Sequence, residues 1–174
     1  MEGVAEHTSR LLLIRHAKSD YPVGVPDHDR PLNARGRANA RVMGRTVREI
    51  LEPLGAYSVA LSTAIRVQET WSAMLESVPT PAHLWNDASL YLAEPAIIAE
   101  VAQCAPTPTV VIVGHNPGIE DLARMRHGAD SARDPHTGRA LHHKLPTSSV
   151  TVIDGAATPW TLEGSRIVGF YVCR

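Results

Sequence analysis

The chain alternates short apolar runs with longer amphipathic stretches, and each pattern predicts a different kind of element. Continuous apolar runs of four to six residues are typical of strands that are buried on both faces of a parallel sheet. A weaker run near residues 83–85 predicts one more strand. The clear runs predict strands at Leu11–Ile14, Tyr57–Leu61, Thr109–Val113, Ser148–Ile153 and Ile167–Val172.

Apolar residues spaced three or four positions apart predict helices between these strands. The first helix follows Asn33, a residue typical of N-caps, and the second follows Ser62 or Thr63, which are both suitable N-caps. Glu94-Pro95 and Asn116-Pro117 predict the starts of two more helices, because proline is well tolerated in the first turn. The stripes expected to face the core are Met43, Val47, Ile50, Leu51 and Leu54; Val67, Trp71, Met74, Leu75 and Val78; and Ile119, Leu122, Ala123 and Met125.

Strands that alternate with helices predict an α/β fold. We expect a three-layer α/β/α sandwich with a mainly parallel central sheet and no large cap domain, formed as a single domain over residues 1–174. The segment 126–145 interrupts the pattern, since it is polar and contains few large apolar residues. A segment of this length without secondary structure is either a passive surface loop or a functional lid.

The composition is that of an ordinary globular domain. Hydrophobic residues make up 44% and charged residues 20%, and the formal net charge is −1. This balance excludes a disordered chain and argues against nucleic-acid binding. The two cysteines, Cys104 and Cys173, form neither a disulfide framework nor a zinc motif. The N-terminus lacks a signal-peptide pattern and no apolar run could cross a bilayer, so we expect a cytoplasmic protein without a membrane partner.

Two predicted strands lead into histidines. The run Leu11–Ile14 is followed at once by Arg15 and His16, and Thr109–Val113 is followed one residue later by His115. Ligands of open α/β sheets bind outside the carboxyl ends of the strands. Adjacent strands lie about 4.8 Å apart, so two such imidazoles could flank one tetrahedral group.

Arg66 places a cation where a helix disfavours it. It lies three residues after Thr63, in the first turn of the predicted helix, where a positive charge opposes the helix dipole. Helix N-termini attract anions, and a guanidinium can hold a phosphoryl group with two hydrogen bonds. Arg15 and Arg66 could each pair with a carboxylate instead. Their coincidence with two histidines favours a functional anion site.

Four segments of the chain form an ordered set of motifs. They are Leu13–Ser19 (LIRHAKS), Asp29–Gly36 (DRPLNARG), Leu61–Thr70 (LSTAIRVQET) and Val113–Gly118 (VGHNPG). In order and spacing they resemble the motifs of the histidine phosphatase (phosphoglycerate-mutase-like) superfamily. Ala17 and Lys18 follow the first histidine, where many members have glycine, and this form resembles the SixA-like phosphohistidine phosphatases.

The resemblance implies a phosphatase that needs no metal and no cofactor. His16 would be the nucleophile and would carry the phosphoryl group transiently. Arg15, Arg66 and His115 would hold the phosphoryl oxygens, and the two arginines would keep His16 neutral near pH 7. Lys18 would either add a donor at the mouth of the pocket or be a solvated loop residue. The substrate would be a protein phosphohistidine or another phosphomonoester.

Glu94 is the candidate proton donor that the resemblance suggests, although the residue also suits the N-cap of the helix that begins at Pro95. Mutase-type members carry a glutamate donor in a separate block and a large inserted cap. Neither is evident in this chain, which argues against mutase activity.

Two other functions remain open. The protein could be a phosphatase for a small metabolite, such as a sugar or nucleoside phosphate, or a phosphate-binding module without turnover. A binding module has no need of a nucleophile, so His16 argues against the second alternative.

The sequence also contains histidines in the polar segment, at positions 127, 136, 142 and 143, but their spacing is not that of metal ligands. The oligomeric state is not indicated.

Overall fold

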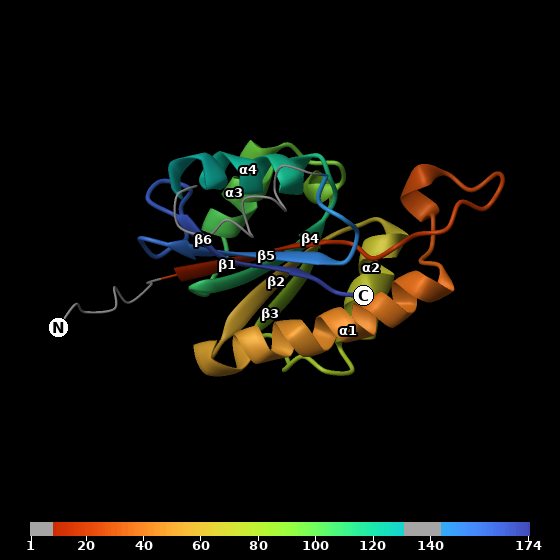
Figure 1. The fold of residues 1–174 in the computed structure, drawn as a ribbon, viewed down its shortest axis with the longest axis horizontal. Coiled ribbons are helices and arrows are strands. Elements are labelled where there is room, and N and C mark those ends of the chain that lie inside the picture. The colour runs from red at the N-terminus through yellow and green to blue at the C-terminus, as the bar shows by residue number, and fades with distance from the viewer. Residues whose placement is uncertain (1–8, 131–143) are drawn as a thin grey trace.

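The computed structural model describes residues 9–130 and 144–174, and its centre is one six-stranded sheet (Figure 1). The strand order is β3-β2-β4-β1-β5-β6. Strands β1 to β4 are mutually parallel, β5 is antiparallel to β1, and β6 is antiparallel to β5. The strands are β1 (Ser9–Arg15), β2 (Tyr57–Ser62), β3 (His83–Asp87), β4 (Thr109–Gly114), β5 (Ser149–Gly155) and β6 (Arg166–Val172).

Helices cover both faces of the sheet, α1 and α2 on one face and α3 and α4 on the other (Figure 1). The described residues contain no inserted cap domain, and the predicted three-layer sandwich with a mostly parallel sheet is confirmed. The helices are α1 (Ala34–Leu51), α2 (Ile65–Met74), α3 (Pro95–Gln103) and α4 (Gly118–Asp130), with short 3-10 helices η1 (Asp27–Asp29), η2 (Glu52–Leu54) and η3 (Ala88–Leu90).

Strand β1 is central, and its apolar residues pack in both directions. Leu11 and Leu13 belong to the cluster under α3 and α4, whereas Leu12 and Ile14 belong to the cluster under α1 and α2. All four side chains are fully buried. Burial of a side chain of this size stabilises the fold by roughly 1.5–3 kcal/mol, which explains an uninterrupted apolar run in place of an alternating one.

The helix starts were predicted in part. Asn33 caps α1, with its side-chain oxygen accepting a hydrogen bond from the Gly36 amide at 2.8 Å. For α2 the prediction was wrong, because the N-cap is Ala64 and no side chain caps the helix. The hydroxyls of Ser62 and Thr63 instead contact His115 and His28.

Three residues of the predicted stripes do not lie on the buried face of their helix. Leu75 follows the last residue of α2 and is 47% exposed, and Met125 on α4 is 50% exposed. Leu54 lies in η2, beyond the end of α1. The prediction that residues 126–145 lack secondary structure was wrong for 126–130, which continue α4. The side chain of His127 and the whole of His136, His142 and His143 lie outside the described residues.

A loop of residues 19–32 extends beyond the carboxyl ends of the parallel strands and carries η1 (orange, Figure 1). Its base is closed by an antiparallel bridge between Ser19 and Leu32. Gly36, at the start of α1, lies so close to this base that a Cβ atom would be 2.0 Å from the carbonyl oxygen of Lys18. Glycine therefore lets α1 pack directly against the chain that follows β1.

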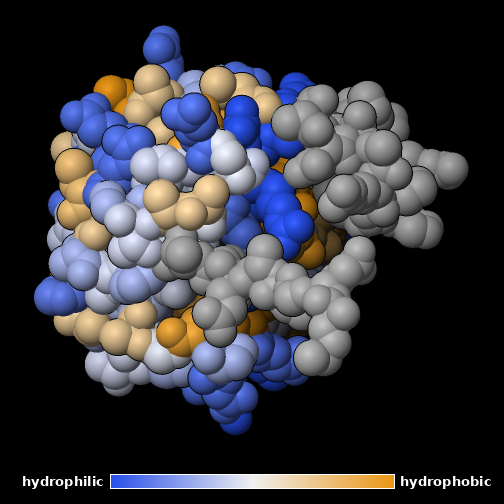
Figure 2. Space-filling view, turned by 90° about the vertical axis from the view of Figure 1, so that its left-hand side faces the viewer, coloured by the Kyte–Doolittle hydropathy of each residue, from blue (hydrophilic) through white to orange (hydrophobic). Residues whose placement is uncertain are grey.

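The end of the molecule opposite the 19–32 loop, on the left in Figure 1, has a mostly hydrophilic surface in its described part. Figure 2 shows this side, where hydrophilic residues (blue) surround small apolar areas (orange) in the described part. None of the helices in the described ranges combines the length and the apolar character needed to span a membrane.

Candidate active site

A cavity of about 150 Å³ opens at the carboxyl edge of β1 and β4. The four residues on which the sequence prediction depends, Arg15, His16, Arg66 and His115, all line it, so the structure brings them together as predicted. The remaining lining residues are Lys18, Ser19, Tyr21, Arg30, Leu92, Asn116 and Thr147.

The pairing of β1 with β4 brings the two histidines together. Arg15 is in register with Gly114, and the amide of His16 donates to the Gly114 carbonyl at 3.1 Å, which extends the ladder by one step. His115 follows directly. The two ring centroids are 5.2 Å apart, with an angle of 60° between the ring planes.

The hydrogen bonds of His16 define its tautomer. Its Nδ1 lies 2.7 Å from the carbonyl oxygen of Ala17, which can only accept, so Nδ1 carries the proton. Its Nε2 accepts from Nε of Arg66 at 3.3 Å. The lone pair of His16 Nε2 is therefore directed at a cation inside the cavity.

His16 is neutral near pH 7. Burial, with smaller effects from the charges of Arg66, Arg15 and Arg30, lowers its pKa to about 3 in spite of the hydrogen bond to Ala17, which favours the protonated ring. The arginines were predicted to keep this ring neutral, but burial is the larger cause. A neutral imidazole retains the lone pair that a nucleophile requires.

His115 faces the same guanidinium. Its Nδ1 lies 3.3 Å from Nη2 of Arg66, a donor, so Nδ1 accepts and Nε2–H donates to Oγ of Ser62 at 2.8 Å. Burial, the neighbouring His16 and Arg66 lower the pKa of His115 to about 3. The guanidinium of Arg66 thus bridges the two imidazoles.

Arg66 also pairs with a carboxylate, the alternative that the sequence left open. Its side chain is almost fully buried, and Nη1 and Nη2 donate to the main-chain carbonyl and to Oδ2 of Asp27 at 2.5 and 3.0 Å. The contacts with Asp27 and with the histidines coexist, because they use different N–H groups of the planar guanidinium.

Arg15 is held differently. Its Nη1 donates to the main-chain carbonyl of Leu145, which also accepts from Nδ2 of Asn116 at 3.2 Å. The buried Glu120 holds the same short segment through the Leu145 amide, at 3.0 Å. No carboxylate within the described residues forms an ion pair with Arg15, so its charge is available to an anion in the cavity.

Lys18 and Glu94 lie in different surroundings. Lys18 lines the cavity, and its Nζ is 5.8 Å from the ring centre of Tyr21. Glu94 is exposed, occupies the N-cap of α3 without a side-chain hydrogen bond, and does not line the cavity.

Sequence reasoning missed the residues that surround the guanidinium of Arg66. The most important is Asp27, whose carboxylate accepts from Arg66, from the Tyr91 hydroxyl at 2.6 Å and from Nη1 of Arg30 at 2.6 Å. The ring of Tyr91 packs edge-on against His115, with 5.4 Å between the centroids. The only available signal was that Asp27 lies two positions before the start of the Asp29–Gly36 motif.

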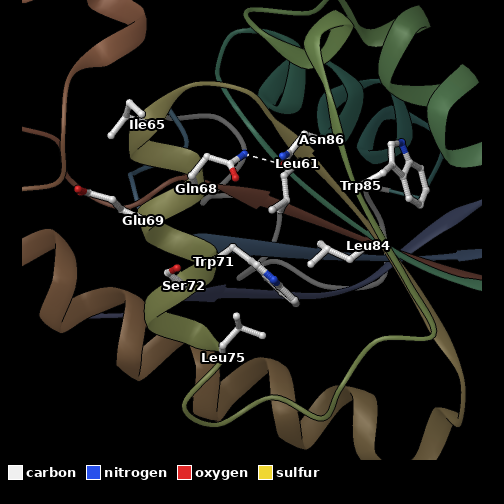
Figure 3. A pocket seen from close by; sticks show the side chains of 10 residues that line it. All are labelled: Leu61, Ile65, Gln68, Glu69, Trp71, Ser72, Leu75, Leu84, Trp85 and Asn86. Atoms are coloured by element: carbon white, nitrogen blue, oxygen red, sulfur yellow. Dashed lines mark hydrogen bonds between the residues drawn. The ribbon is translucent and has the colours of Figure 1, made fainter.

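A larger hollow of about 630 Å³ lies between α2 and β3 (Figure 3). Its lining is mostly apolar, with an amide pair formed by Gln68 and Asn86 at 2.9 Å. It has no histidine, cysteine or arginine in its lining, so the smaller cavity is the better candidate for chemistry. Within residues 9–130 and 144–174 no group of three or more metal-ligating side chains is present.

The low pKa values of His16 and His115 predict a pH-dependent stability. Both are about 3 in the folded protein and about 6.5 in the unfolded chain. Between these values the unfolded state binds more protons, so stability falls as the pH is lowered from about 6.5 towards 3. Each histidine contributes a slope of about 1.4 kcal/mol in the free energy of unfolding per pH unit.

Urea unfolding between pH 6.5 and 4.5 measures this slope. In His115→Gln the dependence should be shallower by about 1.4 kcal/mol per pH unit, since one of the two contributions is gone. An unchanged slope in the variant would mean that His115 is protonated in the folded state.

The α/β/α sandwich thus brings His16, His115, Arg15 and Arg66 together at the carboxyl edge of its sheet. The chain belongs to the histidine phosphatase superfamily, whose branch 1 model matches residues 11–88. An uncharacterized protein of Mycobacterium tuberculosis is 34% identical over 165 residues, which are 92% of this chain and all of the relative.

Two solved structures share the fold. A protein assigned as SixA from Agrobacterium tumefaciens has a TM-score of 0.74 and 25% identity, over 94% of this chain and 97% of that one. The protein histidine phosphatase SixA in complex with tungstate has a TM-score of 0.70 at 13% identity, over 94% of this chain and 96% of that one. The structural similarity to SixA agrees with the motifs found in the sequence.

Proposed function

We propose that the protein is a phosphatase that transfers a phosphoryl group to Nε2 of His16 and then to water. The observation that carries this proposal is the position of His16 Nε2. This atom is unprotonated, lies 3.3 Å from Nε of Arg66, and belongs to a ring that packs against the ring of His115. A neutral imidazole beside two cations is suited to attack phosphorus in a dianionic group.

The reaction has two steps. In the first, Nε2 of His16 forms a bond to phosphorus while the bond from phosphorus to the leaving oxygen or nitrogen breaks, and the leaving group departs with the electron pair. In the second, water attacks the phosphohistidine, inorganic phosphate leaves, and His16 recovers its lone pair. The hydrogen bond from Nδ1–H to the Ala17 carbonyl stabilises the positive charge that develops on the ring.

The remaining cavity residues stabilise charge on the phosphoryl oxygens. Arg15 and Arg66 supply guanidinium donors, and Lys18 adds an ammonium group at the cavity wall. A phosphoryl dianion also favours a proton on Nδ1 of His115, because an anion nearby raises the pKa of an imidazole. His115 then donates a hydrogen bond to the bound group. The departing group also needs a proton; the family resemblance suggests Glu94 as the donor, but its exposed side chain does not line the cavity, so Glu94 would have to act from outside it.

The substrate that we propose is a phosphohistidine on a protein, or another phosphomonoester with an accessible phosphoryl group. The cavity of about 150 Å³ is smaller than the roughly 300–1,000 Å³ of pockets that enclose whole small molecules. Most of such a substrate therefore lies outside it. The Agrobacterium tumefaciens protein named above is assigned as a phosphohistidine phosphatase, and this supports the same substrate class. A metabolite phosphatase, for a sugar or nucleoside phosphate, is the alternative.

Hydrolysis of phosphohistidine, phosphoramidate and p-nitrophenyl phosphate, with a panel of sugar and nucleoside phosphates, tests the proposal. We expect turnover of the phosphoramidates to be unchanged by EDTA, because Arg15 and Arg66 supply the positive charge that a metal ion supplies in other phosphatases.

Complete loss of turnover on chelation, restored by a divalent cation, would contradict the metal-independent mechanism. Binding of inorganic phosphate without turnover of any substrate would identify a phosphate-binding module instead. Turnover restricted to one sugar or nucleoside phosphate would identify the metabolite enzyme.

A further inference from the structure

We propose that Asp27 is a positioning residue, which fixes the guanidinium of Arg66 so that one edge of it faces the two imidazoles. This inference rests on the function proposed above and extends it to a residue outside the predicted catalytic set. It follows from the contacts of Arg66, from those of Asp27, and from the burial of Arg66.

The contacts of Arg66 divide between two edges of the guanidinium. At the edge formed by Nη1 and Nη2, both partners belong to Asp27: its main-chain carbonyl at 2.5 Å and its Oδ2 at 3.0 Å. At the edge formed by Nε and Nη2, the partners are Nε2 of His16 and Nδ1 of His115, each at 3.3 Å. The second edge is the one that a phosphoryl group between the histidines would meet.

Asp27 is itself fixed from two directions. Its Oδ1 accepts from Nη1 of Arg30, and its Oδ2 accepts from the hydroxyl of Tyr91, both at 2.6 Å. These hydrogen bonds and the nearby Arg66 keep the pKa of the Asp27 carboxyl well below its usual range. The carboxylate is thus ionised and oriented whether or not a ligand is present.

Arg66 needs such a partner for a physical reason. Its side chain is only 3% exposed and lies in the first turn of α2, where the helix dipole disfavours a cation. An arginine side chain has about 2 kcal/mol of rotamer entropy, and without the carboxylate only the main-chain carbonyl of residue 27 would hold the edge of the guanidinium that faces away from the histidines. Asp27 both offsets the charge and selects the orientation.

The competing interpretation is that Asp27 blocks the site by occupying the guanidinium in place of phosphate. The edge that it occupies argues against this, because Asp27 bonds to the Nη1–Nη2 edge and not to the Nε–Nη2 edge that faces the two histidines. The two interpretations predict opposite effects on phosphate affinity when the carboxylate is removed.

The test compares Asp27→Ala and Asp27→Asn with the matched control Asp29→Asn. Asp29 lies on the same 3-10 helix, but its exposed carboxylate contacts only His28, at 3.1 Å, among the described residues. We expect Asp27→Ala to weaken the binding of inorganic phosphate by about tenfold and to lower kcat/KM by at least as much, as for loss of a charge-assisted hydrogen bond. Asp27→Asn keeps one acceptor and should lose less, and Asp29→Asn should match the wild type.

A double-mutant cycle identifies the route of the effect. In an Arg66→Ala background, Asp27→Ala should change phosphate affinity and kcat/KM less than twofold, since it acts through Arg66. Independent, multiplicative losses would overturn the proposal, and so would tighter phosphate binding by Asp27→Ala.

Two further measurements test the role of Asp27 if the alanine variant does not fold or if the protein has no phosphatase activity. Should Asp27→Ala fail to fold, Tyr91→Phe removes one hydrogen bond to the same carboxylate and should weaken phosphate binding severalfold, whereas unchanged binding would overturn the proposal. Calorimetric titration with inorganic phosphate requires no turnover. A wild-type protein that binds phosphate but hydrolyses nothing would therefore refute the phosphatase while the role of Asp27 is still measured.

Discussion

Replacing His16 with alanine should reduce turnover to the uncatalysed background. The variant lacks the Nε2 atom that bonds to phosphorus in the proposed mechanism, and no other described residue of the cavity offers a neutral ring nitrogen oriented by a main-chain carbonyl. Inorganic phosphate should still bind, because Arg15, Arg66 and His115 are retained. Rapid quenching with labelled substrate, under alkaline conditions that preserve phosphohistidine, should trap label on the wild type and none on the variant.

His83→Ala is the matched control for this experiment. His83 is exposed on the edge strand β3 and does not line the cavity, so its loss should leave both turnover and trapped label unchanged. Label retained by His16→Ala would place the nucleophile elsewhere, with His115 as the first residue to examine. Normal turnover by His16→Ala would refute the covalent mechanism.

Replacing Arg66 with alanine should lower both affinity and rate without abolishing the covalent intermediate. In the proposed mechanism Arg66 contacts the phosphoryl group in both the ground state and the transition state, so KM should rise and kcat should fall. A charge-assisted hydrogen bond of this kind contributes about 1.5–3 kcal/mol, which corresponds to roughly 10–150-fold in kcat/KM. Labelled phosphoenzyme should still form, more slowly, in a quenched-flow experiment.

Arg66→Lys and Arg41→Ala complete this comparison. Lysine keeps the charge but loses the two-pronged geometry of the guanidinium, so its activity should lie between those of alanine and arginine. Arg41 is exposed on α1 and pairs with Glu76, far from the cavity lining, so its removal should have no effect. Complete absence of phosphoenzyme in Arg66→Ala would mean that Arg66 takes part in forming the bond to phosphorus.

The parts of the site that the sequence predicts are those encoded locally. His16 and His115 each follow a buried strand, and Arg66 occupies a fixed place in the first turn of α2, so their positions depend on a few adjacent residues. The carboxyl edge of a parallel sheet then brings them together. The strand order, with β1 between β4 and β5, could not be derived from these runs, because all of them are similarly apolar.

The parts that the sequence does not predict depend on contacts between distant segments. Asp27 and Arg66 are 39 positions apart, and Tyr91 is 64 positions from Asp27. An acidic residue in a polar loop is usually solvated, so nothing in the local pattern distinguishes Asp27. The expectation that Ser62 or Thr63 caps α2 failed in the same way. The local pattern cannot show that the Ser62 hydroxyl accepts a hydrogen bond from His115, 53 positions away.

The main-chain carbonyls of Asp27 and Leu145 accept hydrogen bonds from Arg66 and Arg15, and this has a thermodynamic consequence. Ordering an arginine side chain opposes binding by up to about 2 kcal/mol of lost rotamer entropy. In this protein the two hydrogen bonds hold Arg15 and Arg66 in the folded chain itself, with no ligand present. An incoming oxyanion therefore meets donors that are already ordered. The entropy lost in ordering them reduces the stability of the fold and does not weaken the binding of the anion.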